Sequence, residues 1–89
     1  MKLQRIEKIS KALGDVNRLK ILQYMQQHEG KVECTQACNL LTLAQPSISH
    51  HIKKLVEADL ILQHKVGRNY NYTINQKVWD RYQKTLAKL

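Results

Sequence analysis

The residues best suited to binding chemistry lie between positions 44 and 58. At the spacing of an α-helix, one side is a polar stripe with hydroxyl, imidazole and ammonium groups: Ser47, His50, His51 and Lys54. Another side is an apolar stripe that consists of Ile48, Ile52, Leu55 and Val56. Such polar groups donate hydrogen bonds to base edges and phosphate oxygens, and an α-helix fits the major groove of DNA. The spacing therefore predicts a recognition helix that presents the polar stripe, with Gln45 at its start, to nucleic acid.

Two further residues of this stretch refine the prediction. Pro46 is the chain's only proline and suits a first helical turn, where the missing N–H has no intrahelical partner in any case. Ser49 is expected near the edge of the core. A solvated polar face is the ordinary alternative, because most surface helices have one. The rest of the chain has to decide between the two.

Catalysis is the other class of function to weigh. His50 and His51 suggest acid–base or metal chemistry, but neighbours on a helix point about 100° apart and do not converge on one ion. The sequence has no glycine-rich phosphate loop and no Ser, His and Asp in the arrangement of a nucleophilic triad. We therefore expect a binding protein and not an enzyme.

Composition favours a polyanionic partner. Fifteen Lys and Arg against seven Asp and Glu leave a net charge of +8 over 89 residues, which favours double-stranded DNA before a membrane surface. This length suits one domain, residues 1–89, whose modest core self-association would supplement. No apolar run suits a membrane span or a signal peptide, and two cysteines do not make a disulfide framework. These features predict a cytoplasmic protein.

Helical periodicity precedes the candidate recognition helix. The apolar spacing predicts a first helix that begins near Leu3 and ends at Gly14, and a second that begins after Asp15 as its N-cap and ends before Gly30. A short third helix over residues 33–42 follows. Only residues 42–45 then remain before the recognition helix, which is the short connection of a helix-turn-helix unit.

After Asp59 the apolar spacing changes from helical to alternating. The alternating residues are Leu60 and Leu62, then Tyr70, Tyr72 and Ile74. They lie on either side of a turn that contains Gly67, so the pattern predicts a β-hairpin. Residues 76–89 return to helical spacing. Four helices, a hairpin and a fifth helix predict a mainly α fold with a β-hairpin wing, a winged helix-turn-helix.

Three stretches of the chain resemble one family. Residues 13–22 are similar to the L-x-D-P-T-R-L-x-I-L opening of the ArsR-type (arsenical-repressor-like) bacterial repressors. Residues 45–52 resemble that family's Q-P-x-I-S-x-H-L recognition helix. Its G-L-V … G-R-x-x-x-Y wing resembles Leu60 and Ile61 followed by Gly67, Arg68 and Tyr72. The three motifs occur in the right order and spacing over nearly the whole chain, so together they are strong evidence for the resemblance.

The resemblance implies a transcriptional repressor that binds an inverted-repeat operator as a homodimer joined through its first and last helices. Lys65 and Arg68 of the basic hairpin tip would then contact phosphate or the minor groove. The candidate dimer-interface residues on the terminal helices are Ile6, Ile9, Val78, Trp79, Tyr82 and Leu86. Core packing within one chain is an equal alternative for these six, since exposed apolar patches mark interfaces but buried ones do not.

The alternative function is a winged-helix adaptor that docks onto another protein without sequence-specific DNA binding. DNA binding weakens steeply with salt, in proportion to the phosphates that are neutralised, whereas a protein contact does not follow that law. Salt dependence therefore separates the two functions.

Many members of the family sense metals, and this chain departs from their motifs. Residues 76–89 contain no histidine, so the family's paired Asp and His set is absent. The family's other metal motif is E-L-C-x-C-D-L on the third helix. Cys38 matches the last cysteine of its arsenical variant, but Glu33 and Thr35 stand at the two earlier cysteines, so the trio of thiolates is not reproduced. We therefore expect no cofactor, with Cys34 and Cys38 as small core residues. The alternative is a thiol pair that binds a soft metal ion or is oxidised.

Overall fold

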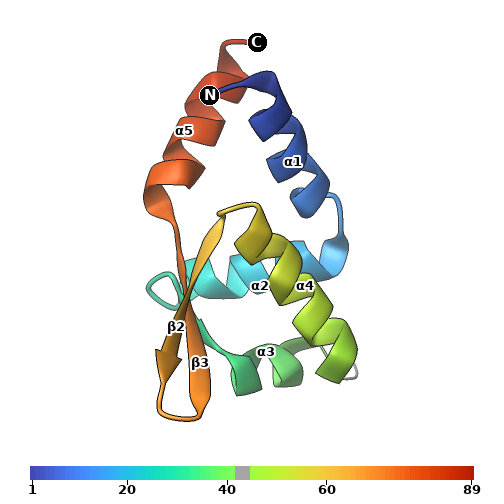
Figure 1. Cartoon of the computed structure of the whole chain (residues 1–89), viewed down its shortest axis with the longest axis vertical. Helices are drawn as coiled ribbons and strands as arrows, with labels where there is room; N and C mark the ends of the chain where they lie inside the picture. Colours follow the sequence, from blue (N-terminus) through green and yellow to red (C-terminus); the bar gives the residue numbers. More distant parts are fainter. Residues whose placement is uncertain (42–44) are drawn as a thin grey trace.

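The computed structural model describes residues 1–41 and 45–89, and all of their side chains except those of Cys34, Cys38, Leu41, Gln45 and Pro46. The elements in chain order are α1 (Leu3–Leu13), α2 (Val16–Gln27), β1 (Lys31–Glu33), α3 (Cys34–Leu41), α4 (Gln45–Glu57), β2 (Ile61–Val66), β3 (Asn69–Ile74) and α5 (Gln76–Ala87). Both termini lie at one end of the molecule and the β2–β3 hairpin extends towards the other (Figure 1). The predicted winged helix-turn-helix order is confirmed. None of the described helices is long and apolar enough to cross a membrane.

The junction between α1 and α2 follows from two adjacent residues. Gly14 caps the C-terminus of α1, and its N–H donates to the carbonyl of Lys11 at 3.2 Å. Asp15 is extended, and its carboxylate accepts from the backbone N–H of Asn17 and Arg18. A side chain of this type satisfies N–H groups that the first turn of a helix leaves without an intrahelical partner. The predicted stop and restart at Gly14 and Asp15 are confirmed.

Helices α2 and α4 end with the same backbone device. Glu29 and Asp59 both have left-handed φ values, 59° and 60°. The following residues, Gly30 and Leu60, donate their N–H groups back to the carbonyls of Met25 and Leu55. This is the Schellman pattern, which satisfies carbonyls at a helix end and turns the chain sharply. In α4 it places Leu60 in the core, directly before the hairpin.

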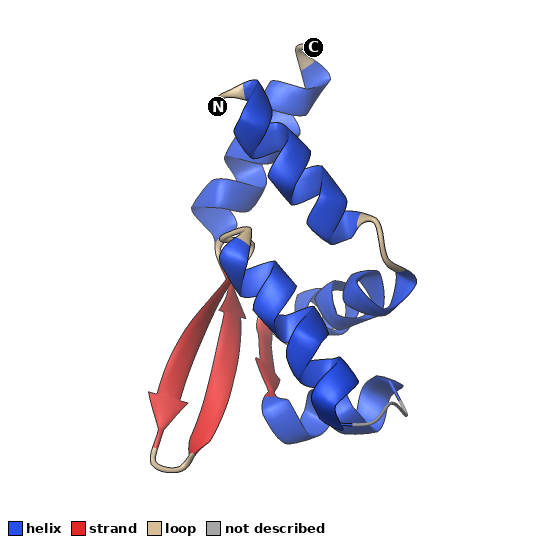
Figure 2. Ribbon diagram, turned by 45° about the vertical axis from the view of Figure 1, so that its right-hand side comes forward, coloured by secondary structure: helices blue, strands red, loops and turns tan. Residues whose placement is uncertain are grey.

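The sheet has one strand more than the predicted hairpin. Its order is β1-β3-β2, with both pairs antiparallel (Figure 2). Strand β1 was not predicted, and Glu33 belongs to it and not to the third helix. The predicted apolar face is wrong at Leu62, which pairs with Thr73 and is exposed, whereas Ile61 pairs with Ile74 and is buried. Within β2 only Ile61 is buried, so burial in this strand does not alternate, and Leu60 is buried as part of the helix-terminating turn.

Packing within one protomer covers part of the apolar surface of the terminal helices. The buried side chains of α1 and α5 include Ile6, Ile9 and Tyr82. The Tyr82 hydroxyl lies 2.9 Å from the Ser10 hydroxyl, and α1 packs against α5 in the same chain. The prediction that these three residues form a dimer interface is therefore wrong, because each is already covered within the protomer. Val78 and Trp79 are partly buried, and Leu86 is exposed.

Candidate nucleic-acid interface

Helix α4 presents a polar face to solvent over an apolar base. Ile48, Ile52 and Leu55 are buried, and α4 packs on α2, α3 and β2. Ser47, His50 and Lys54 of the polar stripe are exposed. The 100° periodicity of the sequence therefore separates core from surface as predicted at these six positions.

Hollows flank α4 on both sides near its C-terminal end, so that this part of the helix stands between them as a ridge. The α1-side groove has a volume of about 250 Å³ and is lined by Lys8, Lys11, Ala12, Arg18, Lys54, Glu57 and Ala58. The wing-side groove has a volume of about 450 Å³ and is lined by Ser49, Ile52, Lys53, Val56, Glu57, Gln63, Tyr70 and Tyr72. In Figure 2 the strands lie on one side of α4, and α1 and α2 lie on the other. A ridge between two hollows is the shape that fits a DNA groove with its two bordering backbones.

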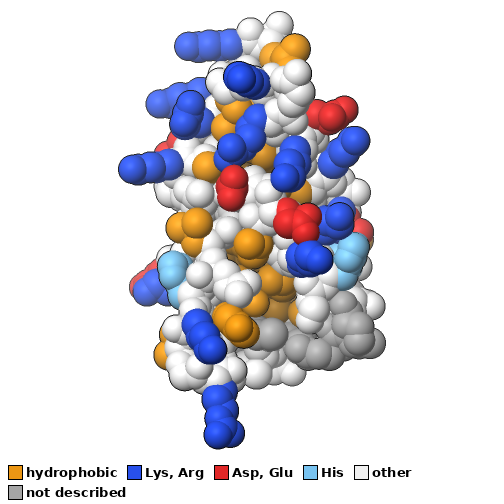
Figure 3. Space-filling model, viewed as in Figure 1, with side chains coloured by type: hydrophobic (Ala, Val, Ile, Leu, Met, Phe, Trp, Pro, Cys, Tyr) orange, Lys and Arg blue, Asp and Glu red, His pale blue; other side chains and the backbone are white. Residues whose placement is uncertain are grey.

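The face that carries α4 is rich in basic side chains. Figure 3 shows many Lys and Arg side chains over its upper part, where α1 and α5 lie, and others at its lower end, where the hairpin lies. Acidic side chains are fewer on the same face. This distribution matches the net charge of +8 and suits a polyanionic partner.

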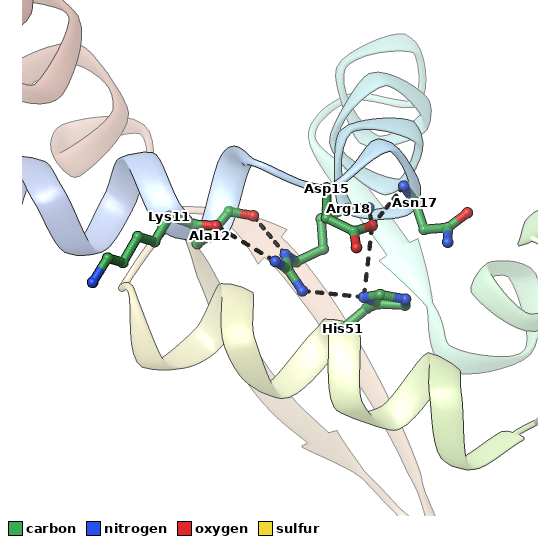
Figure 4. A network of polar contacts seen from close by, with 6 residues as sticks. All are labelled: Lys11, Ala12, Asp15, Asn17, Arg18 and His51. Carbon is green, nitrogen blue, oxygen red and sulfur yellow. Dashed lines mark hydrogen bonds and ion pairs between the residues drawn. The ribbon is translucent and has the colours of Figure 1, made fainter.

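His51 does not face outward, and its predicted place in the polar stripe is wrong. Its residue surface is only 9% exposed, because the ring points towards the start of α2. Its Nδ1 lies 3.3 Å from Nη1 of Arg18 and 3.9 Å from Oδ1 of Asp15 (Figure 4). A guanidinium only donates, so Nδ1 accepts this bond in the tautomer that carries its proton on Nε2. His51 therefore joins α4 to α2.

Arg18 is the centre of this network. Its Nε donates to the carbonyl of Ala12 at 2.6 Å, and its Nη2 lies 3.4 Å from the carbonyl of Lys11 (Figure 4). These carbonyls belong to the last turn of α1, where carbonyls lack the usual partner one turn further along the helix, and that of Lys11 also accepts from the N–H of Gly14. One side chain thus ties the end of α1, the start of α2 and the middle of α4 together. Sequence reasoning missed this role, although the arginine stands in the opening motif of the family.

The same contacts lower the pKa of the Asp15 carboxyl group. Burial alone would raise the pKa of its carboxyl group, but the N–H groups of Asn17 and Arg18, together with the positive charge of His51 when protonated and of Arg18, lower it below its usual value. Hydrogen bonds and cations stabilise the ionised carboxylate. Asp15 therefore remains an anion and an acceptor throughout the neutral range.

Two exposed residues of α4 were not assigned to the interface by sequence. Ser49 was expected at the core edge, but it is exposed and lines the wing-side groove. Lys53 is also exposed, and its Nζ lies 4.0 Å from Oε1 of Glu57. Both lie on the arc of α4 opposite His51. Their helical phase was readable from the sequence, but the direction in which the core lies was not.

The hairpin tip is built as predicted. Val66 pairs with Asn69, which leaves Gly67 and Arg68 as a two-residue turn. Gly67 has a φ of 62°, a conformation that favours glycine, and open space surrounds it. Lys65 and Arg68 are both exposed. The turn therefore holds a cation at the far end of the molecule.

Three predicted site side chains lie outside the described part of the structure: those of Gln45, Cys34 and Cys38. Gln45 is the first residue of α4, and both cysteines lie in α3. Among the side chains that the structure describes, no three His, Asp or Glu residues are grouped as metal ligands would be.

Known proteins share this arrangement. A family described as a helix-turn-helix domain matches residues 13–64. The arsenical resistance operon repressor of Staphylococcus xylosus is 34% identical over 83 residues, which cover 90% of this chain and 75% of that protein. The crystal structure of an ArsR family transcriptional regulator superposes with a TM-score of 0.86 at 24% identity, over 99% of this chain and 89% of its own.

A solution structure matches in the same way. It is the homodimeric winged helix-turn-helix DNA-binding domain of a possible ArsR-family regulator from Mycobacterium bovis. Its TM-score is 0.78 at 20% identity, over 96% of this chain and 78% of its own. The sequence match and the shared fold confirm the resemblance: this chain belongs to the ArsR family of winged helix-turn-helix transcriptional regulators.

Proposed function

We propose that this protein is a transcriptional repressor that binds an inverted-repeat operator as a homodimer in the cytoplasm, with a binding role and not a catalytic one. The observation that carries the proposal is the exposed face of α4, which presents Ser47, His50 and Lys54 to solvent and has a groove on each side near its C-terminal end. Hydroxyl and imidazole groups read base edges, and a lysine binds phosphate or guanine. Gln45 at the start of α4 belongs to the same proposed surface.

The hairpin supplies the second proposed contact. Arg68 in the turn and Lys65 on β2 are exposed. Figure 3 shows Lys or Arg side chains at the hairpin end of the face. A flexible cation at this place would bind phosphate or enter the minor groove beside the major groove that holds α4. This contact adds affinity and positions α4, whereas the bases are read from α4.

The proposed dimer forms through the outer surfaces of α1 and α5. Apolar side chains remain exposed at this end of the protomer: Leu3, Leu86 and Leu89. On α5, Val78 and Trp79 are also only partly buried. Exposed apolar surface marks protein interfaces, and the related domain from Mycobacterium bovis is described as homodimeric. A second copy placed here would bring two α4 helices to one side of a duplex.

The test of DNA reading is His50→Ala. A binding site is first selected from random duplexes with the wild-type protein, and affinities for this site and for random DNA are then measured. Loss of a base contact should lower the ratio of the two affinities by about 5- to 150-fold. The matched control is His28→Ala, which removes another exposed imidazole away from α4. Equal ratios for both variants and the wild type would contradict the proposed role of α4.

Repression is tested with the selected site placed over a promoter. In transcription with purified polymerase, added protein should reduce the transcript, because a dimer on the promoter excludes polymerase. The His50→Ala variant should reduce it less at the same concentration. A rise in transcript would show an activator instead.

The dimer is tested with a pair of matched variants. Leu86 and Leu62 are exposed to nearly the same extent, 44% and 43%, but Leu86 lies on α5 and Leu62 on the hairpin. Leu86→Glu should convert the dimer to a monomer in light scattering, because it buries a charge in the interface. Leu62→Glu should remain a dimer. A dimeric Leu86→Glu protein would exclude this interface.

A further inference from the structure

The α1-side groove carries more positive charge than the polar stripe alone. Three lysines and one arginine line it, from α1, α2 and α4, against a single carboxylate: Lys8, Lys11, Arg18, Lys54 and Glu57. Two of the lysines come from α1, a helix that the motifs of the sequence do not connect with DNA. The groove therefore extends the basic surface of α4 onto a second helix.

Most of this charge is not neutralised within the protein. Glu57 lies 4.0 Å from Lys53, on the other side of α4. Lys11 lies 3.9 Å from Glu7, but both side chains are mostly exposed, so water and salt screen the pair. Among the described residues, neither Lys8 nor Lys54 forms an ion pair. Three ammonium groups are thus available to an external anion.

The remaining cation of the groove has a different role. Arg18 is held by the carbonyls of Lys11 and Ala12 and by His51, so its guanidinium organises the wall of the groove. It also fixes the end of α1 against α4. The lysines of α1 therefore have a defined position relative to the recognition helix.

A helix in the major groove has a phosphate backbone on each side of it. The major groove of DNA is about 12 Å wide, close to the diameter of a helix with its side chains. The two DNA strands that border it must therefore lie along the flanks of the helix. Both flanks of α4 are hollowed near its C-terminal end, and the α1-side groove has the greater excess of cations over carboxylates.

We propose that Lys8 and Lys11 of α1, together with Lys54 of α4, bind phosphates of one DNA strand in the α1-side groove. The inference rests on the proposed insertion of α4 into the major groove. Contacts to phosphate position a protein on the duplex but do not read sequence. Helix α1 therefore raises the affinity for operator and random DNA equally and sets the depth and angle of α4.

The test compares two variants of equal charge. Lys8→Gln with Lys11→Gln removes two exposed lysines from the groove, and Lys77→Gln with Lys84→Gln removes two exposed lysines from α5. Circular dichroism and thermal melting check that both proteins fold as the wild type does. Affinity for the selected duplex and for random duplexes is then measured from about 50 to 200 mM salt.

The slope of log affinity against log salt reports the phosphates neutralised. Loss of one to two phosphate contacts per protomer should reduce the slope of the dimer by about 1.8 to 3.6, so that this fourfold rise in salt weakens the α1 variant at least about 12-fold less than the wild type. The reduction should be equal on both DNAs and absent from the α5 variant.

Each other outcome overturns a distinct statement. Equal slopes for the α1 and α5 variants would overturn the phosphate contact while the wild type still binds DNA. A slope that falls only on the selected duplex would also overturn it, because a phosphate contact does not depend on sequence. Wild-type protein without salt-dependent duplex binding would overturn the proposed function, and this inference with it.

Discussion

Replacement of His51 by Ala separates the structural role of this residue from a DNA-reading role. The ring is buried between α4 and the start of α2 and accepts from Arg18 at 3.3 Å. We expect His51→Ala to lower the free energy of unfolding and to leave the preference for operator over random DNA unchanged. His50→Ala, one residue away and exposed, should leave the free energy of unfolding unchanged and lower the preference for operator over random DNA.

The magnitude follows from three contributions. A hydrogen bond to a charged donor contributes about 1.5 kcal/mol at the weak end of its range, which suits a length of 3.3 Å. Loss of the buried ring carbons adds about 1 kcal/mol. Alanine regains about 0.5 kcal/mol in helix propensity. The net loss is about 2 kcal/mol, which lowers the melting temperature of a domain of this size by about 8–16 °C.

The assay is urea unfolding of both variants and the wild type at equal protein concentration, because the stability of a dimer depends on concentration. His51→Asn is the matched control. Its side-chain oxygen takes the position of Nδ1 and accepts from Arg18, so it should recover about 1 kcal/mol of the loss. The ratio of affinities for operator and random DNA is measured under conditions in which each protein is folded.

Two results would refute this reasoning. A His51→Ala protein as stable as the wild type would show that the Arg18 contact contributes nothing. A folded His51→Ala protein with a reduced affinity ratio would show that the ring reaches DNA after all.

Three further predictions concern other parts of the chain. The pKa of the Asp15 carboxyl group is lowered in the folded state, so its ionised form stabilises the protein at pH values above the unfolded pKa of about 3.9. This stabilisation is lost as the pH falls through the lower folded pKa. When the free energy of unfolding is measured from about pH 6 to 3, the advantage of the wild type over Asp15→Asn should vanish at the acid end. Arg68→Ala should reduce the salt slope of DNA binding by about 0.9 per lost phosphate contact, and an unchanged slope would leave Arg68 as a solvated turn residue. DNA affinity of the reduced protein should not respond to As(III), Cd(II) or peroxide, and the Cys34→Val, Cys38→Ala protein should bind equally; release of DNA from the wild type alone would instead assign a sensing role to the thiol pair.

Local signals made most of the fold predictable. Gly14 and Asp15 end α1 and begin α2 through contacts within a few residues, and Gly67 forms a turn that needs its positive φ. The order of elements follows from periodicity in the same way. Strand β1 escaped prediction because three residues carry no readable alternation, and its partner Tyr72 lies 40 positions away from Val32.

The candidate site was predictable only in part, for a related reason. The spacing of α4 shows which residues share a face, and Ser47, His50 and Lys54 are exposed as expected. It does not show how wide the buried arc is. The start of α2 widens that arc to include His51, while Ser49 on the other flank remains open beside the hairpin.

The sequence by itself therefore determined the helices, their caps, the hairpin turn and the basic character of the protein, because each depends on neighbouring residues or on composition. Tertiary structure decided which apolar and polar side chains remain free for a partner. Ile6, Ile9 and Tyr82 are covered because α1 meets α5, and Lys8 and Lys11 flank the recognition helix because Arg18 joins α1 to α4. Such contacts join residues far apart in the chain, and no local pattern encodes them.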